Sequence, residues 1–304
     1  MHLERHTIPW GLAIPCSQTG SVGGILLGTL RKVRLEGVKG MRRTVLLLAS
    51  MAVGVLLAGG VAQAIINGQP DRKEHPYVGM VYNGEYICSG TLISPPVFLT
   101  VAHCTQAYER ADLQVRVTFE SRADFDPDAA YTGTPYTHPK WDGFPDFPDV
   151  GVVVLDEAVD TGAGYGRLPE AGIVERFEMD KELLTVVGYG VRGFETGSGK
   201  PEPTAGGIRE KSTVEYFGTD GAANSFAAGG YYIKTLQASG GEGGEGACLG
   251  DSGGPHFLPH DQRTVVAVSS FGVGNVGVAY DCGGASYAQG VDVEVVLGWV
   301  RGFL

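Results

Sequence analysis

The chain reads Ala-Cys-Leu-Gly-Asp-Ser-Gly-Gly-Pro over residues 247–255. Glycine weakens helices and strands, and proline removes a backbone donor, so this run suits neither element. It suits a tight turn that exposes the hydroxyl of Ser252 and points neighbouring backbone N–H groups inward. Such a turn could also be a plain surface feature. Its chemistry therefore depends on partner residues elsewhere in the chain.

Two candidate partners lie upstream, and they are His103 and Asp149. His103 alone could be a half-buried structural histidine beside a disulfide. Asp149 alone could be a solvated charge in the acidic loop 144–149. Unlike Asp146, however, Asp149 directly precedes the apolar run 150–155, which is typical of a buried strand. Its carboxylate is therefore expected at the strand entrance, where it can be buried and oriented.

A serine hydroxyl is a weak nucleophile until a base accepts its proton, and histidine is suited to that task near neutral pH. The order His103, Asp149, Ser252 resembles that of the trypsin/chymotrypsin family of serine endopeptidases, here in a secreted, bacterial-type form. Subtilisins and α/β-hydrolases order these groups differently. The resemblance implies that Asp149 orients His103 and that the N–H groups of Gly250 and Ser252 form the oxyanion hole.

Short alternating or apolar runs separated by Gly, Pro, Asn and Asp predict an all-β fold. They include residues 78–82, 113–119, 150–155, 184–187, 214–217 and 265–268. The resemblance implies a chymotrypsin-like architecture of two six-stranded Greek-key antiparallel β-barrels with a C-terminal helix. The first barrel is expected over about 65–165 and the second over about 176–304, with a crossover within 160–175 and the helix within 293–304.

The N-terminal region predicts a signal peptide over residues 41–64. Met41-Arg42-Arg43 is followed by an apolar stretch and by the small-x-small sequence Ala62-Gln63-Ala64. A membrane-anchoring helix is the alternative, because the apolar stretch approaches the length that spans a bilayer. Residues 1–40 fit neither reading, and we interpret them as a mis-assigned extension before a start at Met41. The predicted product is extracellular, without a membrane anchor after signal cleavage.

The sequence Ile65-Ile66-Asn67-Gly68 resembles the start of mature proteases of the family. The resemblance implies that a freed ammonium at Ile65 pairs with Asp251 and thereby orders the oxyanion hole. Because Ala64 ends the predicted signal sequence, we expect that export itself activates the enzyme.

The chain has five cysteines, of which Cys16 lies in the doubtful extension. The even remainder suits an exported protein with disulfides. The resemblance pairs Cys88 with Cys104 and Cys248 with Cys282. Metal binding is the alternative, but the sequence has no Cys-x-x-Cys and no close Cys/His cluster. No acidic loop has a spacing specific for calcium, so neither a metal nor a cofactor is expected.

Charge bears on the possible partners. Residues 1–64 hold seven of the 23 basic and two of the 34 acidic residues, and the remainder has a formal charge of −16. Such a surface disfavours nucleic acid and anionic membranes. The resemblance implies protein or peptide substrates and a monomeric enzyme.

The substrate pocket is expected to be uncharged. The resemblance places its floor at Gly246 beside Ala247 and one wall at Ser270-Phe271-Gly272, where Ser270 also bonds Asp149. The opposite wall falls at Gly284, Ala285 or Ser286. The glycine-rich stretch 239–246 is then a pocket loop rather than a linker. This arrangement predicts cleavage after apolar residues. If Glu245 or Asp281 turns inward, specificity for basic residues returns.

Two other functions compete with the peptidase. An inactive binding module of the same fold generally loses a triad member or the Gly-Asp-Ser-Gly-Gly-Pro turn, and this chain keeps both. An esterase usually places Gly-x-Ser-x-Gly between a strand and a helix, and helix-forming segments are scarce here.

Overall fold

A computed structural model describes residue 65 and residues 68–82, 87–123, 130–143, 147–178, 181–191, 194–195, 202–203, 206–219, 230–237, 246–274 and 284–304. Several predicted features lie outside these residues. They are the extension 1–40, the signal peptide 41–64, Cys16, most of the stretch 239–246 with Glu245, and the residues Asp281 and Cys282.

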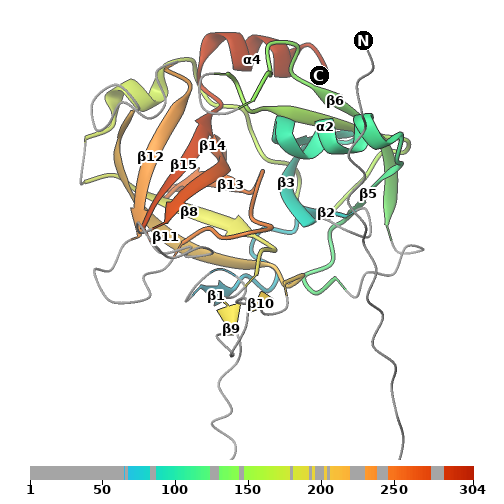
Figure 1. Ribbon diagram of the computed structural model, residues 1–304, viewed down its shortest axis with the longest axis horizontal. Helices are drawn as coiled ribbons and strands as arrows, with labels where there is room; N and C mark the ends of the chain where they lie inside the picture. Colours follow the sequence, from blue (N-terminus) through green and yellow to red (C-terminus); the bar gives the residue numbers. More distant parts are fainter. Residues whose placement is uncertain are drawn as a thin grey trace, which may run out of the picture. The chain divides into compact units, whose positions relative to one another are not determined.

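The first barrel consists of six antiparallel strands: β2 (Val78–Tyr82), β3 (Ile87–Ser94), β4 (Val97–Thr100), β5 (Val115–Thr118), β6 (Tyr131–Thr137) and β7 (Gly151–Leu155). They close in the order β2-β3-β4-β7-β6-β5 (Figure 1). Apolar side chains from these strands fill the interior, among them Leu92, Phe98 and Val152, each fully buried.

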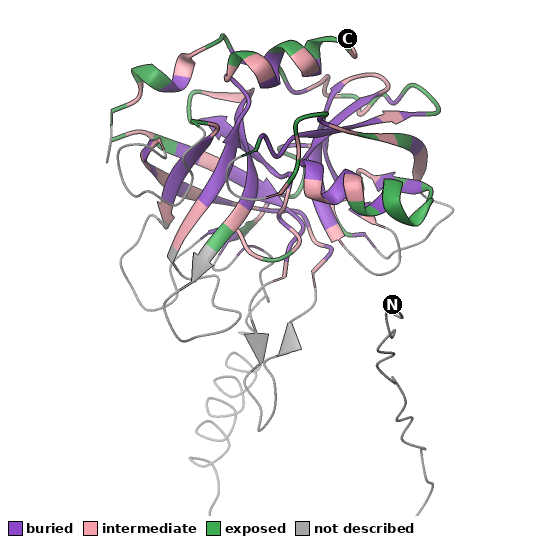
Figure 2. Ribbon diagram, turned by 45° about the horizontal axis from the view of Figure 1, so that its top comes forward, coloured by how far each residue is buried: buried purple, intermediate pink, exposed green. Residues whose placement is uncertain are grey.

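The second barrel consists of β8 (Leu183–Gly188), β11 (Glu210–Thr219), β12 (Tyr232–Gln237), β13 (Pro255–Leu258), β14 (Asp261–Gly274) and β15 (Gly284–Gly290). Pairing of β8 with both β11 and β13 closes it. The short strand β1 (Gln69–Pro70) adds to the edge of β11, and β9 (Phe194–Glu195) pairs only with β10 (Glu202–Pro203). Strand β11 alternates buried and partly exposed residues along its whole length, as expected of a strand with one face inward. Figure 2 shows the buried residues gathered on the strands of both barrels.

In the part of the chain that the structure describes, the helical segments are α2 (Ala102–Ala111), the 3₁₀ turn η2 (Ile173–Arg176) and α4 (Glu294–Arg301). Helix α4 buries Val296, Leu297 and Val300 on one face, so the predicted closing helix is confirmed. The two-barrel fold class is confirmed as well. Helix α2 was not predicted. Among the described residues, no helix has the length and apolar character needed to cross a membrane.

His256 is a polar residue inside the second barrel, on β13. Neither ring nitrogen has a hydrogen-bond partner among the described residues. Burial lowers the pKa of His256 to about 4. The unfolded chain takes up this proton near pH 6.5, whereas the folded chain resists it, so the free energy of unfolding should fall by about 3 kcal/mol between pH 6.5 and pH 4.

Replacing His256 with Leu should remove this loss of unfolding free energy at acidic pH. The measurement is urea unfolding at pH 7 and pH 4, with the exposed His260→Ala as the control variant. An equal loss of stability in His256→Leu and in the unaltered protein would contradict the assignment.

Candidate active site

His103 and Asp149 meet at one end of the first barrel. His103 is the second residue of α2, directly after β4, and Asp149 lies just before β7. Strands β4 and β7 pair Thr100 with Gly151, which brings the two segments together. His103 Nδ1 lies 2.8 Å from Asp149 Oδ2, and the His103 backbone N–H donates to Oδ1 over 2.9 Å.

Proton positions in this pair follow from chemistry. An ionised carboxylate only accepts hydrogen bonds, so Nδ1 carries the proton in the neutral imidazole. Nε2 is then left with a lone pair and can act as a base. The His103 side chain is 28% exposed while Asp149 is fully buried. The base is therefore accessible and its partner is shielded from water.

Two residues of the second barrel contact Asp149. Ser270 on β14 donates its hydroxyl to Asp149 Oδ2 over 2.5 Å. The Asp149 backbone N–H donates to Gln289 Oε1 over 2.7 Å. Gln289 is fully buried on β15 and donates in turn to the carbonyls of Tyr231 and Gly290. Sequence reasoning missed Gln289, although an amide in an otherwise apolar strand end was a usable signal.

The Ser252 loop is a tight turn. Gly250 and Gly253 have positive φ angles of 95° and 84°, which favour glycine. The Asp251 N–H donates to Cys248 O (3.0 Å) and the Gly254 N–H donates to Asp251 O (2.8 Å). A Cβ on Gly253 would lie 2.2 Å from both Ser89 O and Thr100 Oγ1, so only glycine fits against the first barrel there.

Short links connect Ser252 to His103 across the two barrels. The Ser252 carbonyl accepts the N–H of Ser89 over 2.7 Å, and the Ser89 hydroxyl donates to Gly250 O over 2.9 Å. Ser89 follows Cys88, which forms the predicted disulfide with Cys104, the neighbour of His103. A ring nitrogen of His103 lies within 4.8 Å of both sulfur atoms. Because these sulfurs are bonded to each other, they are not thiolate ligands for a metal.

The predicted oxyanion donors lie at the turn. Leu249 O accepts the N–H of Val191 over 2.7 Å. In a trans peptide the C=O and N–H point in opposite directions, so the Gly250 N–H points away from Val191. Within the described residues, the N–H groups of Gly250 and Ser252 donate no hydrogen bond. Both donors are available to a ligand.

The predicted pair of Ile65 with Asp251 requires an amino terminus freed by a cut after Ala64, so for the uncut chain it stays a prediction. The Ile65 N–H donates to Glu210 Oε2 over 3.0 Å, while Asp251 accepts from the N–H groups of Gly190 (2.8 Å) and Cys248 (2.9 Å). In the uncut chain the Ile65 nitrogen is a neutral peptide nitrogen joined to Ala64. Burial raises the pKa of Asp251 to about 7, although these two backbone hydrogen bonds lower it.

The predicted pocket residues lie on β14, β15 and the segment before the turn. Gly246 is buried, Ala247 and Phe271 are half-buried, and Gly272 is exposed with open space where a Cβ would stand. Gly272 pairs with Ser286 across β14 and β15. Phe271 stacks on Tyr287, with ring centroids 4.8 Å apart and an interplanar angle of 10°.

The remaining pocket and cysteine predictions are only partly described. Ala285 and Gly284 oppose Val273 and Gly274 in the same strand pair, and the described pocket residues carry no charge. Cys248 is disulfide-bonded, and its predicted partner Cys282 lies outside the described residues.

Comparison with known proteins agrees with this geometry. A family model described as Trypsin matches residues 65–294. The chain is 29% identical over 212 residues to the vitellin-degrading protease of Bombyx mori, covering 66% of this chain and 72% of that protein. It is 26% identical over 210 residues to the trypsin of Saccharopolyspora erythraea, covering 66% and 83%. The solved structure of HL collagenase superposes with a TM-score of 0.60 at 21% identity, covering 79% of this chain and 98% of that one. That structural likeness concerns the fold alone.

Proposed function

Because the chain belongs to the trypsin family of serine endopeptidases, we propose that it is a secreted enzyme that cleaves peptide bonds with Ser252, His103 and Asp149. The observation that carries the proposal is the 2.8 Å contact between a partly exposed imidazole and a fully buried carboxylate. A surface ion pair would not be shielded in this way. The substrates of the family are proteins or peptides, and the negative charge of the chain outside residues 1–64 is consistent with a soluble exported enzyme.

The proposed reaction has two stages. Ser252 Oγ attacks the substrate carbonyl carbon while His103 Nε2 takes the hydroxyl proton, and the carbonyl oxygen becomes an oxyanion held by the N–H groups of Gly250 and Ser252. The C–N bond then breaks as Nε2 returns the proton to the leaving amine, which leaves an acyl-enzyme. Water attacks this ester in the same way and releases the acid and Ser252.

Asp149 supports both stages without changing its own protonation. Its carboxylate fixes the Nδ1–H tautomer and stabilises the imidazolium that forms transiently. The hydrogen bond from Ser270 and the backbone contact to Gln289 hold this carboxylate in place. Removing one oxyanion-hole donor typically costs about 100- to 1000-fold in kcat.

A covalent probe tests this assignment. A peptidyl phosphonate should label the secreted wild-type protein and leave Ser252→Ala unlabelled. Sequencing the labelled protein should give Ile65 as the first residue, because the proposed signal cleavage follows Ala64. Equal labelling of both proteins would refute the role of Ser252, and another first residue would refute activation by export. Turnover of peptide amides as well as esters separates a peptidase from an esterase.

Activation by export is supported by the state of Asp251. Its raised pKa means that ionising the carboxyl in the uncut fold costs about 4 kcal/mol more than in water. The protonated carboxyl thus stabilises the uncut fold at acidic pH, and this stability is lost as the pH rises from about 4 to about 7. A nearby ammonium, created when the bond between Ala64 and Ile65 is cut, would offset that cost.

We propose a preference for apolar residues before the scissile bond. Gly246, Ala247 and Gly272 offer an open, uncharged space, and Phe271 adds an aromatic wall. A panel of peptides that differ only at that residue should show kcat/KM for Phe or Leu at least tenfold above that for Arg or Lys, because charge burial without a partner is costly. The opposite ranking would favour basic specificity through Glu245 or Asp281.

A further inference from the structure

Strand β1, a few residues after Ile65, lies along β11. Strand β1 pairs Gln69 with Lys211 and Pro70 with Glu210. The Gly68 N–H donates to the Ile65 carbonyl over 2.7 Å, a contact typical of a tight turn. A Cβ on Gly68 would lie 2.7 Å from Ile65 Cβ and 3.1 Å from the Lys211 carbonyl, so the turn requires glycine.

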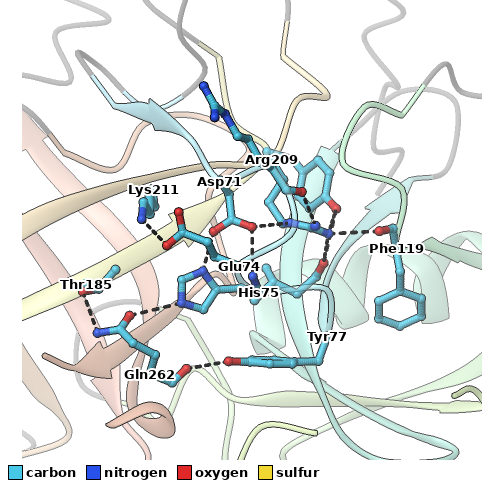
Figure 3. A network of polar contacts seen from close by, with 12 residues as sticks. Asp71, Glu74, His75, Tyr77, Phe119, Thr185, Arg209, Lys211 and Gln262 are labelled. Atoms are coloured by element: carbon cyan, nitrogen blue, oxygen red, sulfur yellow. Dashed lines mark hydrogen bonds and ion pairs between the residues drawn. The ribbon is translucent and has the colours of Figure 1, made fainter. Parts of the chain in front are cut away.

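The far end of this segment is anchored at Asp71. Its Oδ2 accepts from Arg209 Nε over 2.8 Å and from the His75 N–H over 3.1 Å, and its Oδ1 contacts His75 Nδ1 (Figure 3). Burial raises the pKa of Asp71, but the contacts with His75 and Arg209 outweigh it and hold the pKa below the usual value. Arg209 also donates to the carbonyls of Val78 (3.0 Å) and Phe119 (2.9 Å) in the first barrel. Ile65 is therefore six residues from a fixed point.

Glu210, the next residue after Arg209, contacts Ile65 at the start of this segment. Ile65 N lies 3.0 Å from Glu210 Oε2, and both residues are fully buried. Ile65 packs in an apolar cluster with residues that include Leu184 and Val214. Glu210 is thus a buried carboxylate at the very atom that becomes the amino terminus of the proposed mature chain.

Glu210 and Asp251 lie on one face of the β8–β11 pair. Glu210 is directly opposite Gly188 in the register of the two strands, and side chains of opposed residues leave the same face of a sheet. A Cβ on Gly188 would stand 2.1 Å from Asp251 Oδ1. The Glu210 side chain consequently leaves the sheet on the side where the Asp251 carboxylate lies.

We propose that Glu210 is a positioning residue that, together with Asp251, holds the ammonium of Ile65 in the mature enzyme. The inference rests on the proposed function and adds a residue to it. An ammonium has three donors and can serve two carboxylates. The nitrogen that would become this ammonium already lies 3.0 Å from Glu210 Oε2 in the uncut chain. By holding the amino terminus, Glu210 helps to keep the Asp251 turn, and with it Gly250, in the active geometry.

The test is the alkaline limb of kcat/KM in the mature enzyme, measured from pH 6 to pH 11. A free α-amino group titrates near pH 7.7–8.0, and a neighbouring carboxylate raises that pKa by about one to three units. Glu210→Gln should therefore lose on the order of tenfold in kcat/KM between pH 7 and pH 9, where the unaltered enzyme loses little. Glu210→Asp should retain most of the wild-type profile. The matched control is Glu215→Gln, a partly exposed glutamate on the same strand.

If kcat/KM fell at the same alkaline pH in Glu210→Gln and in the unaltered enzyme, the inference would be overturned. The proposed function would stay intact, because the wild type would still be an active serine peptidase. If Glu210→Gln does not fold, a crystal structure of the mature wild type decides. An Ile65 amino nitrogen within hydrogen-bond distance of Glu210 supports the inference, and one bonded to Asp251 alone rejects it.

Discussion

In Ser252→Ala, kcat for peptide hydrolysis should fall about a million-fold, which is the scale of loss when a triad nucleophile is removed. The turn should survive the change, because its backbone is held by the N–H of Ser89 on the Ser252 carbonyl and by the Gly253 N–H on the Ser269 carbonyl. The thermal midpoint should therefore stay unchanged. Activity is measured with a peptide substrate on protein whose far-UV spectrum matches the wild type.

A matched control for that variant is Ser94→Ala, at the end of β3 in the first barrel. It removes a hydroxyl of the same kind from a partly exposed position and should leave kcat unchanged. If Ser252→Ala kept more than about one hundredth of the wild-type rate, Ser252 could not be the nucleophile.

In Asp149→Asn, kcat should fall about 10,000-fold with the fold preserved, a magnitude known from trypsin-type triads in general. The amide oxygen can still accept the backbone N–H of His103. The amide NH₂ group, however, donates a hydrogen bond toward Nδ1, where the carboxylate accepted one. Nδ1 must then be the acceptor, and the proton moves to Nε2, which no longer serves as a base for Ser252. Measuring kcat against pH checks this result.

The comparison variant for Asp149→Asn is Ser270→Ala, which removes one hydrogen bond to the carboxylate and leaves the tautomer alone. Its loss should be roughly tenfold to a hundredfold, the value of one charge-assisted hydrogen bond. If both variants lost comparable amounts of kcat, Asp149 would serve mainly to support the loop and not to fix the tautomer of His103.

Much of the fold followed from local patterns in the sequence. The alternating run 113–119 became strand β5, because a half-buried strand needs period-two hydrophobicity. Helix α2 escaped prediction, although residues 102–111 contain neither glycine nor proline and include good helix formers.

The buried polar contacts could not be predicted in the same way. Gln289, Glu210 and Asp71 are polar residues in or beside strands, and such positions are expected to face solvent. Each is fully buried because a partner distant in the sequence satisfies it. Only the three-dimensional register of the strands identifies those partners. The resemblance implied Asp251 as the partner of Ile65. The position of Glu210 beside Ile65 followed only from the register of β11.

The anchoring of Asp149 by Ser270 and Gln289 has a consequence for the newly made chain. His103 and Asp149 belong to the half that is synthesised first, yet the contacts of Asp149 with Ser270 and Gln289 come from the half that is synthesised last. A nascent chain with one completed barrel therefore lacks these two contacts as well as the nucleophile. The proposed proteolysis requires both the docking of the two halves and the cut before Ile65, so partly made molecules do not digest themselves or their neighbours.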